Sequence, residues 1–464
     1  MAHIVEPEDM PNLSLAMALF AHRLGQYRLP DTIAERARVC LLNGYGIALG
    51  SMQTPYSAVA VQAVLASDGE VEKGATFLGD GRRSSIAGAA FANSALFHGR
   101  AQEDTCGAAH LGAILIPLLT ALVEARERNA LSRLLPALVA GYEIGGLLEK
   151  AWSGSTTPAG FRSSPLYGTV AAAAATATLL GLSIEQTAGA LSNAASFTGG
   201  LLQSFEDGTD EWRYQVGIAA RTGWLATELA RAGSRSAPYA FEGRSGFAHA
   251  FAHSGCDVKA LAAQLGEEWA IERVTFKPFP VCAFNQTPVH AALALREQAG
   301  ARSIRGVTVR MHPYEAAYAG MDSKGPFQTV SGTLMSVPFC IALTLLRGAP
   351  TLSLMTTYAD GEVNALADRV HLRADDSMPR LSCSIELELA DGQKLSHYQM
   401  MNPSDYAYDR AGVRALVQRV GAESAIPTVV FDELERAVND PVHHFDDVFR
   451  CFEAARQCSR SAAQ

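Results

Sequence analysis

Residues 102–110 read QEDTCGAAH, and they interrupt a region that is otherwise rich in small and apolar side chains. Before them, residues 86–97 have the composition of a buried helix, and after them residues 111–123 are almost continuously apolar. A carboxylate, a hydroxyl, a thiol and an imidazole between two buried helices must satisfy one another or face a pocket, because an unpaired polar group is costly to bury. We expect these residues to line a ligand pocket.

Length and composition indicate an enzyme-sized, helix-rich protein. The chain has 464 residues, of which 48% are hydrophobic and 18% are charged. That length exceeds what one hydrophobic core usually supports, so two domains are expected. The net charge of -9 offers no basic surface for nucleic acid or an anionic membrane. We therefore expect neither as a partner.

The cysteines and the amino terminus predict a cytoplasmic location. Eight cysteines are scattered without a C-x-x-C pair, and the first ten residues, MAHIVEPEDM, lack the pattern of a secretion signal. The longest run of small and apolar residues, 170–182, falls short of the roughly 20 residues that span a membrane. His443 and His444 show no recurring ligand spacing, so no metal site is predicted.

Periodicity divides the chain into two kinds of structure. Helical spacing recurs through most of the first 270 residues and returns after residue 402. Between them, residues 307–311 and 381–389 alternate between apolar and polar side chains, and Asp391-Gly392 predicts a hairpin turn. The sequence therefore predicts a mainly α protein. A large all-helical domain comprises residues 1–270 and 403–464, and a smaller α+β lid domain, residues 271–402, is inserted before the C-terminal helices.

Five ordered patches of the chain match the motifs of one known family. They are Asn93 to His98 with Glu103-Asp104-Thr105, His110 and Gly112 to Pro117; Gly141 to Gly146; Tyr167 to Ala173; Lys277 to Cys282; and Ser336 to Phe339. They resemble segments of the MmgE/PrpD family, which includes 2-methylcitrate dehydratase, cis-aconitate decarboxylase and iminodisuccinate epimerase. The resemblance implies a helical domain with an α+β lid, a homodimer, and a small polycarboxylate as substrate.

Other positions depart from the dehydratase and decarboxylase members of that family. Ala101 stands where those members carry an aspartate, and Arg162 and Gln286 stand where they carry histidines. Their K-R-L-H segment is Trp212-Arg213-Tyr214-Gln215 here, so only the arginine is kept. Proton-carrying imidazoles have been exchanged for permanent cations and amides. This argues against transferring dehydration or decarboxylation without further support.

The remaining residues suit proton transfer beside a carboxylate. Arg162 and Arg213 are candidate carboxylate clamps, because a guanidinium forms two parallel hydrogen bonds and keeps its charge. Lys277 is either a cation that stabilises the developing negative charge or the base itself. Epimerisation needs one group to remove the proton and another to return it from the opposite face. His110 with either Asp104 or Lys277 can form that pair.

We therefore predict Asp104, His110 and Lys277 as catalytic residues, with no cofactor and no metal. The predicted substrate-binding residues are Thr105, Arg162, Tyr167, Arg213 and Gln286. Structural alternatives stay open: Asp104 can cap a helix beginning near Cys106, His110 can bond to backbone, and the two arginines can form surface ion pairs.

The preferred interpretation is a cofactor-independent isomerase, and iminodisuccinate epimerase is the family activity that fits best. The alternative is a hydro-lyase or decarboxylase of the 2-methylcitrate dehydratase or cis-aconitate decarboxylase type. An alternative of another class is a non-catalytic carboxylate-binding protein that keeps the arginines.

Overall fold

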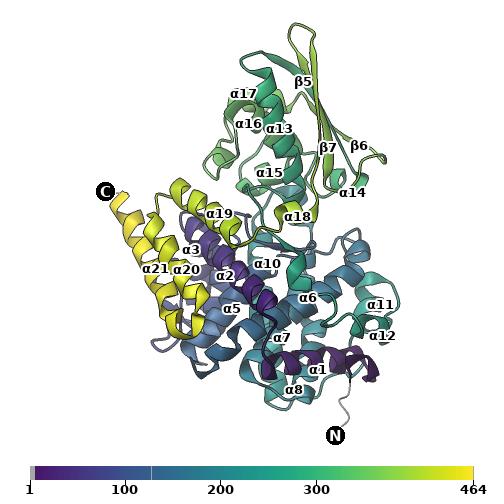
Figure 1. The fold of residues 1–464 in the computed structure, drawn as a ribbon, viewed down its shortest axis with the longest axis vertical. Coiled ribbons are helices and arrows are strands. Elements are labelled where there is room, and N and C mark those ends of the chain that lie inside the picture. The colour runs from purple at the N-terminus through teal and green to yellow at the C-terminus, as the bar shows by residue number, and fades with distance from the viewer. Residues whose placement is uncertain (1–5, 127, 463–464) are drawn as a thin grey trace. The chain divides into compact units, whose positions relative to one another are not determined.

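The computed structural model describes residues 6–126 and 128–462, and the chain is mainly α, as predicted (Figure 1). It divides into two compact units. The larger comprises Met1–Leu201, Arg213–Phe276 and Tyr408–Gln464, and the smaller comprises Leu202–Trp212 and Lys277–Ala407. The chain thus crosses between units after residues 276 and 407, a few residues later than the sequence suggested. The short segment 202–212 had not been expected in the smaller unit, because it lies within a helical pattern.

Helices make up most of the larger unit. They are α1 (Leu13–Gln26), α2 (Asp31–Gly50), α3 (Pro55–Ser67), α4 (Ile86–Phe97), α5 (Gly112–Ala125), α6 (Leu134–Thr156), α7 (Ser163–Leu180), α8 (Ile184–Phe197), α10 (Glu211–Arg231), α11 (Phe247–Ala252), α12 (Val258–Ala262), α19 (Arg410–Glu423), α20 (Thr428–Asn439) and α21 (Pro441–Ala462). Two short antiparallel pairs accompany them: β1 (Ala75–Thr76) with β2 (Arg83–Ser84), and β3 (Thr105–Cys106) with β4 (Val274–Thr275). The C-terminal helices, yellow in Figure 1, pack on α2 and on one another.

Small residues allow α6 and α7 to pack closely at the centre of this unit. A Cβ added at Gly145 would lie 2.8 Å from the Cβ of Ala171, and one added at Gly141 would lie 2.7 Å from Leu115. By length and composition, the helix of residues 129–156 could cross a membrane. However, 72% of its apolar 18-residue stretch is buried inside the structure. We interpret this stretch as a core helix, because α6 packs against α1, α2, α5 and α7.

The smaller unit contains the sheet that the alternating pattern predicted. Its strands β5 (Ile304–Met311), β6 (Val370–Ala374), β7 (Ser382–Leu389) and β8 (Lys394–Met400) lie in the order β6-β5-β7-β8. Only the β5–β6 pair is parallel. The β7–β8 hairpin turns at Asp391-Gly392, where Gly392 has a φ of 84°. The helices are α9 (Gln203–Asp207), α13 (Gln286–Ala299), α14 (Pro313–Ala316), α15 (Val330–Met335), α16 (Val337–Arg347), α17 (Gly361–Ala367) and α18 (Pro403–Tyr406).

Arg36 of α2 contacts the chain at two places in the larger unit: just before it leaves the unit after Phe276 and where it returns at Tyr408. Its guanidinium donates to the carbonyls of Ile271, at 3.3 Å, and of Val274, and it lies 4.8 Å from the Phe276 ring centroid. It also donates to the Tyr408 carbonyl at 2.6 Å. One half-buried cation therefore holds the chain within the larger unit both before it leaves and after it returns.

We predict opposite effects on stability for two glycine-to-alanine changes. In Gly46→Ala, the new methyl would lie 2.4 Å from Val417 Cγ1, so overpacking should cost about 1–3 kcal/mol. In Gly154→Ala, nothing lies within 4 Å of the new methyl on exposed helix surface, so the helix should gain up to about 1 kcal/mol. Urea-unfolding midpoints measure both. Equal shifts would contradict the close packing of α2 on α19.

Candidate active site

The loop between α4 and α5 brings His98, Glu103 and His110 together. Glu103 Oε1 lies 3.0 Å from His98 Nδ1 and 2.9 Å from His110 Nδ1. The centroids of the two imidazole rings are 5.2 Å apart. Ala101 has a φ of 56°, in the left-handed region that costs a residue with a Cβ roughly 1–2 kcal/mol. This turn reverses the chain so that His98, at the end of α4, meets Glu103.

Arg162 determines which His98 nitrogen carries the proton. Arg162 Nη2 lies 2.6 Å from His98 Nε2. A guanidinium has only donors, so Nε2 must accept, and the proton of the neutral ring lies on Nδ1, facing Glu103. Burial is the main reason that the pKa of His98 lies well below its usual value; Glu103 opposes this shift, and Arg162 and His110 add to it. His98 is therefore a neutral imidazole whose Nδ1 proton lies on the side of Glu103.

His110 is oriented by two acceptors. Its Nδ1 lies 2.9 Å from Glu103 Oε1 and 3.2 Å from the Asp104 carbonyl oxygen. The Nδ1 proton therefore faces protein, and Nε2 is the nitrogen that can take up or release a proton. The backbone N–H of His110 donates to Ser164 Oγ of α7 at 3.0 Å. The His110 side chain is 17% exposed, whereas His98 and Glu103 are 1% exposed or less, so solvent reaches His110.

The carboxylate of Asp104 faces the core rather than the histidine pair. Its Oδ2 accepts from the Tyr142 hydroxyl at 2.6 Å. Asp104 contacts His110 through its backbone carbonyl oxygen instead. The helix-cap alternative is wrong, because strand β3 begins after Asp104, and the Thr105 hydroxyl bonds that of Thr275 at 2.7 Å across the β3–β4 pair. These contacts do not support catalysis by the Asp104 carboxylate. They also do not support substrate binding by Thr105.

The two predicted carboxylate clamps have different neighbours. Arg162 is buried at the start of α7 and donates to His98 and, at 3.3 Å, to Gln215 Oε1. Arg213 is fully buried with its guanidinium 3.8 Å from the Tyr56 ring centroid. Positions 213 and 215 of α10 project to roughly opposite sides of a helix with 3.6 residues per turn. Neither arginine is a surface ion pair, and Arg162 supports His98 rather than lying open to a substrate carboxylate.

Tyr167 and Gln286 have structural contacts that the sequence did not reveal. The Tyr167 hydroxyl bonds Thr156 Oγ1 at 2.7 Å in the core between α6 and α7. The Gln286 amide bonds the backbone of Phe279 at 3.2 and 3.0 Å within its own unit. Both positions argue against the predicted substrate contacts. Lys277 is the first residue of the smaller unit after the crossing and is 4% exposed. Its catalytic role stays a prediction.

Sequence reasoning overlooked His98 and Glu103 as functional residues. Both lie in the segment that resembles the family motif, but the sequence predicted a role for neither. The available signal was three titratable residues, at 98, 103 and 110, in one short polar interruption of an apolar region. Within residues 6–126 and 128–462, no group of three or more His, Cys, Asp or Glu side chains is placed to hold a metal ion.

The mainly helical larger unit thus holds a buried carboxylate in contact with two imidazoles, an arrangement suited to proton transfer. Models of the MmgE/PrpD N-terminal domain and of the MmgE/PrpD C-terminal domain match residues 15–257 and 279–407. The chain belongs to the MmgE/PrpD family.

Its relatives in this family include decarboxylases and a dehydratase. A cis-aconitate decarboxylase-like protein of Aspergillus oryzae is 27% identical over 410 residues, which cover 82% of this chain and 84% of the relative. The cis-aconitate decarboxylase of Aspergillus terreus is 27% identical, with coverage of 74% and 73%. An alkylcitrate dehydratase of a fungal species is 25% identical, with coverage of 81% and 78%. The enzyme class is thus supported, and all three relatives carry the names of lyases.

We predict that His98 stays neutral, with its proton on Nδ1, through the pH range in which an ordinary histidine titrates. The reason is the lowered pKa caused by burial, together with the Arg162 donor on Nε2. Nitrogen chemical shifts of ¹⁵N-histidine-labelled protein measure this directly. Arg162→Met should raise the pKa of His98, because it removes a positive charge and the donor to Nε2. Titration of His98 near its ordinary pKa in the unmodified protein would contradict the assignment.

Proposed function

We propose that the chain is a cofactor-independent lyase that acts on a small polycarboxylate by transferring a proton, through His110, at a carbon next to a carboxylate. The observation that carries the proposal is the single Glu103 oxygen that lies within 3.0 Å of both Nδ1 atoms and leaves His110 Nε2 to exchange a proton. The names of the relatives, cis-aconitate decarboxylase and alkylcitrate dehydratase, support a lyase.

The relay makes His110 both an oriented base and a stabilised acid. When Nε2 takes up a proton, the positive charge on His110 lies beside the Glu103 carboxylate. A buried carboxylate stabilises such an imidazolium and keeps the ring in one orientation. Because Glu103 is 1% exposed, little water screens this interaction. His98 holds Glu103 from the other side, and Arg162 holds His98.

Either lyase reaction can use this arrangement. In a dehydration, neutral His110 removes a proton from carbon next to a carboxylate, the carbon–carbon double bond forms, and the hydroxyl on the neighbouring carbon takes up a proton from solvent and leaves as water. In a decarboxylation, the bond to a carboxylate carbon breaks, its electron pair stays on the carbon left behind, carbon dioxide leaves, and protonated His110 donates its proton to that carbon. General acid–base catalysis of this kind contributes roughly 10²- to 10⁴-fold.

Epimerisation is the second candidate. The observation that favours it is Arg162, which the sequence resemblance places where lyase members carry a histidine and which donates to His98 at 2.6 Å. Without that histidine, the residues described here include no assigned acid for the leaving hydroxyl of a dehydration. Epimerisation has no leaving hydroxyl, although it needs a second group to return the proton from the opposite face of the substrate.

Incubation in deuterium oxide with cis-aconitate, 2-methylcitrate or iminodisuccinate separates these activities. We expect either carbon dioxide release with one deuterium on the carbon that lost it, or an unsaturated product that absorbs in the ultraviolet. Deuterium entering the substrate without loss of water or carbon dioxide would overturn the lyase in favour of the epimerase. Ligand-dependent thermal stabilisation without turnover would indicate a binding protein and overturn both.

We predict that His110→Asn lowers kcat by about 10²- to 10⁴-fold, because no other member of the relay reaches solvent to exchange the proton. KM should change far less, since the imidazole acts on the transition state. His443→Asn is the matched control: this side chain is 75% exposed on α21 and bonds Asp440. Equal activity of the two variants would remove His110 from the mechanism.

A further inference from the structure

Two consecutive residues of α6 hold two different chain segments. The Tyr142 hydroxyl donates to Asp104 Oδ2 at 2.6 Å. The two Glu143 oxygens accept from the backbone N–H groups of Ala270, at 2.8 Å, and Ile271, at 3.0 Å. Neighbouring positions on a helix project about 100° apart, so one turn of α6 can hold both segments.

The two segments lead directly into the β3–β4 pair. Asp104 precedes β3, and residues 270–273 precede β4. The strands pair as Thr105 with Thr275 and Cys106 with Val274. Gly146 lets β3 and the turn before β4 approach α6, because a Cβ there would lie 2.7 Å from that of Ala270 and 2.9 Å from Cys106 Sγ. Helix α6 therefore contacts β3 and the segment that leads into β4.

Asp104 links Tyr142 to His110, because its side chain bonds Tyr142 and its backbone carbonyl bonds His110. Tyr142 holds the Asp104 side chain, and the carbonyl of the same residue accepts from His110 Nδ1 at 3.2 Å. Backbone hydrogen bonds between Cys106 and Ala109, of 2.8 and 3.2 Å, close the loop that follows. A shift of Asp104 would also move its neighbour Glu103, whose oxygen lies 2.9 Å from His110.

We propose that Tyr142 and Glu143 are positioning residues: together they clamp the β3–β4 pair and so hold the His110 loop in place for proton transfer. Neither side chain is assigned contact with the substrate. This inference rests on the proposed function of His110. Its structural part, the immobilisation of residues 102–110 and 268–276 by α6, is testable without any substrate.

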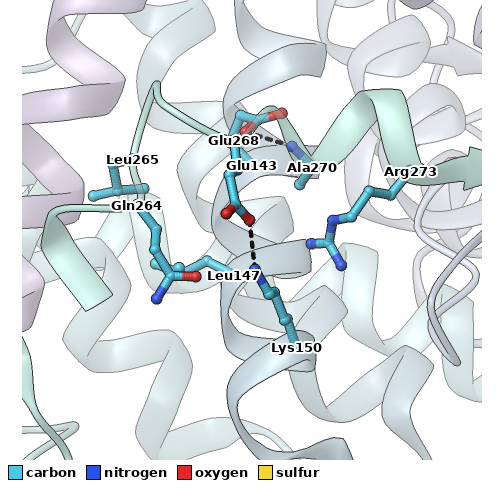
Figure 2. Close-up of a pocket in the computed structure, with 8 residues that line it drawn as sticks. All are labelled: Glu143, Leu147, Lys150, Gln264, Leu265, Glu268, Ala270 and Arg273. Atoms are coloured by element: carbon cyan, nitrogen blue, oxygen red, sulfur yellow. Dashed lines mark hydrogen bonds and ion pairs between the residues drawn. The ribbon is translucent and has the colours of Figure 1, made fainter. Parts of the chain in front are cut away.

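The environment of Glu143 gives the clamp a measurable pH dependence. Burial raises the pKa of Glu143 to about 7, against the two backbone N–H donors, which lower it. Figure 2 shows Glu143 directed at Ala270, with Lys150 bonded to Glu268 in the same small pocket. The charged and titratable groups around Glu143 are Arg273 and Glu272 from η3 (Ala270–Arg273), Lys150 from α6, Glu268 from the preceding loop, and the Cys106 thiol from β3.

The stability that Glu143 contributes should decrease as the pH rises, because its pKa is higher in the folded state than in the unfolded state. A carboxyl whose pKa is raised in the folded state stabilises the fold fully below its ordinary pKa, and this contribution is lost as the pH rises through about 7. Opening of the segment that exposes Glu143 should therefore become easier between about pH 5 and 8. In Glu143→Gln this pH dependence disappears, because the amide does not titrate, and one of the two backbone N–H groups loses its acceptor.

Hydrogen–deuterium exchange of the full-length protein tests the structural part. After correction for intrinsic rates, protection of residues 268–276 should fall from pH 5 to 8 in the unmodified chain and stay flat in Glu143→Gln. At fixed pH, Tyr142→Phe and Glu143→Gln should both speed exchange in residues 102–110. Glu268→Gln is the matched control, because this exposed side chain lines the same pocket and bonds Lys150 instead of backbone. Unchanged exchange in the first two variants would overturn the proposal, whatever the enzymatic activity is.

Steady-state kinetics tests the catalytic part. For Tyr142→Phe and Glu143→Gln we expect kcat, per folded molecule, to fall by roughly 10- to 100-fold with KM within about twofold, because misplacement affects the transition state most. Folded fractions are measured by circular dichroism at the assay temperature. A role confined to stability would lower the folded fraction and leave kcat per folded molecule unchanged, which would overturn positioning. If exchange responds but no substrate turns over, the proposed function fails and the clamp stands.

Discussion

One carboxylate oxygen organises the site: Glu103 Oε1 lies 3.0 Å from His98 Nδ1 and 2.9 Å from His110 Nδ1. A buried carboxylate is costly unless polar neighbours compensate for the lost water, and here two imidazole nitrogens lie beside it. The same contacts decide the chemistry of the rings, because each histidine is left with its proton on the nitrogen that faces Glu103. Arg162 supplies the balancing positive charge, one neutral imidazole away from Glu103. Acidic and basic charges are thus both buried, with His98 between them.

Rigid neighbours keep this arrangement in place. The loop that carries Glu103 and His110 is held by α6 through Tyr142, by α7 through Ser164, and by β4 through the strand pair. Gly112 makes the first of these possible, because a Cβ there would lie 2.2 Å from Asp104 Oδ1 and 2.7 Å from the Tyr142 hydroxyl. Sites supported by packed helices hold their geometry better than sites on unsupported loops. Close packing by small residues therefore serves the chemistry as well as the core.

The structure gives contacts to two positions at which the sequence resemblance implies a departure from the lyase members. Arg162, expected at a histidine position, donates to His98 Nε2. Gln286, also expected at a histidine position, bonds the backbone of Phe279. In both cases the side chain supports its surroundings. With identities of 25–27% to the three relatives described, such changes of role at motif positions decide how far an activity can be transferred.

The sequence alone determined the mainly α class and the β7–β8 hairpin at Asp391-Gly392. These follow from periodicity and turn chemistry, which are local and set by backbone geometry. The sequence also singled out residues 102–110, whose role stays a prediction. The contacts of Arg162, Tyr167 and Gln286 were decided only by tertiary structure. Arg162 meets His98 across 64 positions of sequence, and Tyr142 meets Asp104 across 38. No local pattern encodes which buried donor and acceptor will meet, because that depends on how whole helices pack.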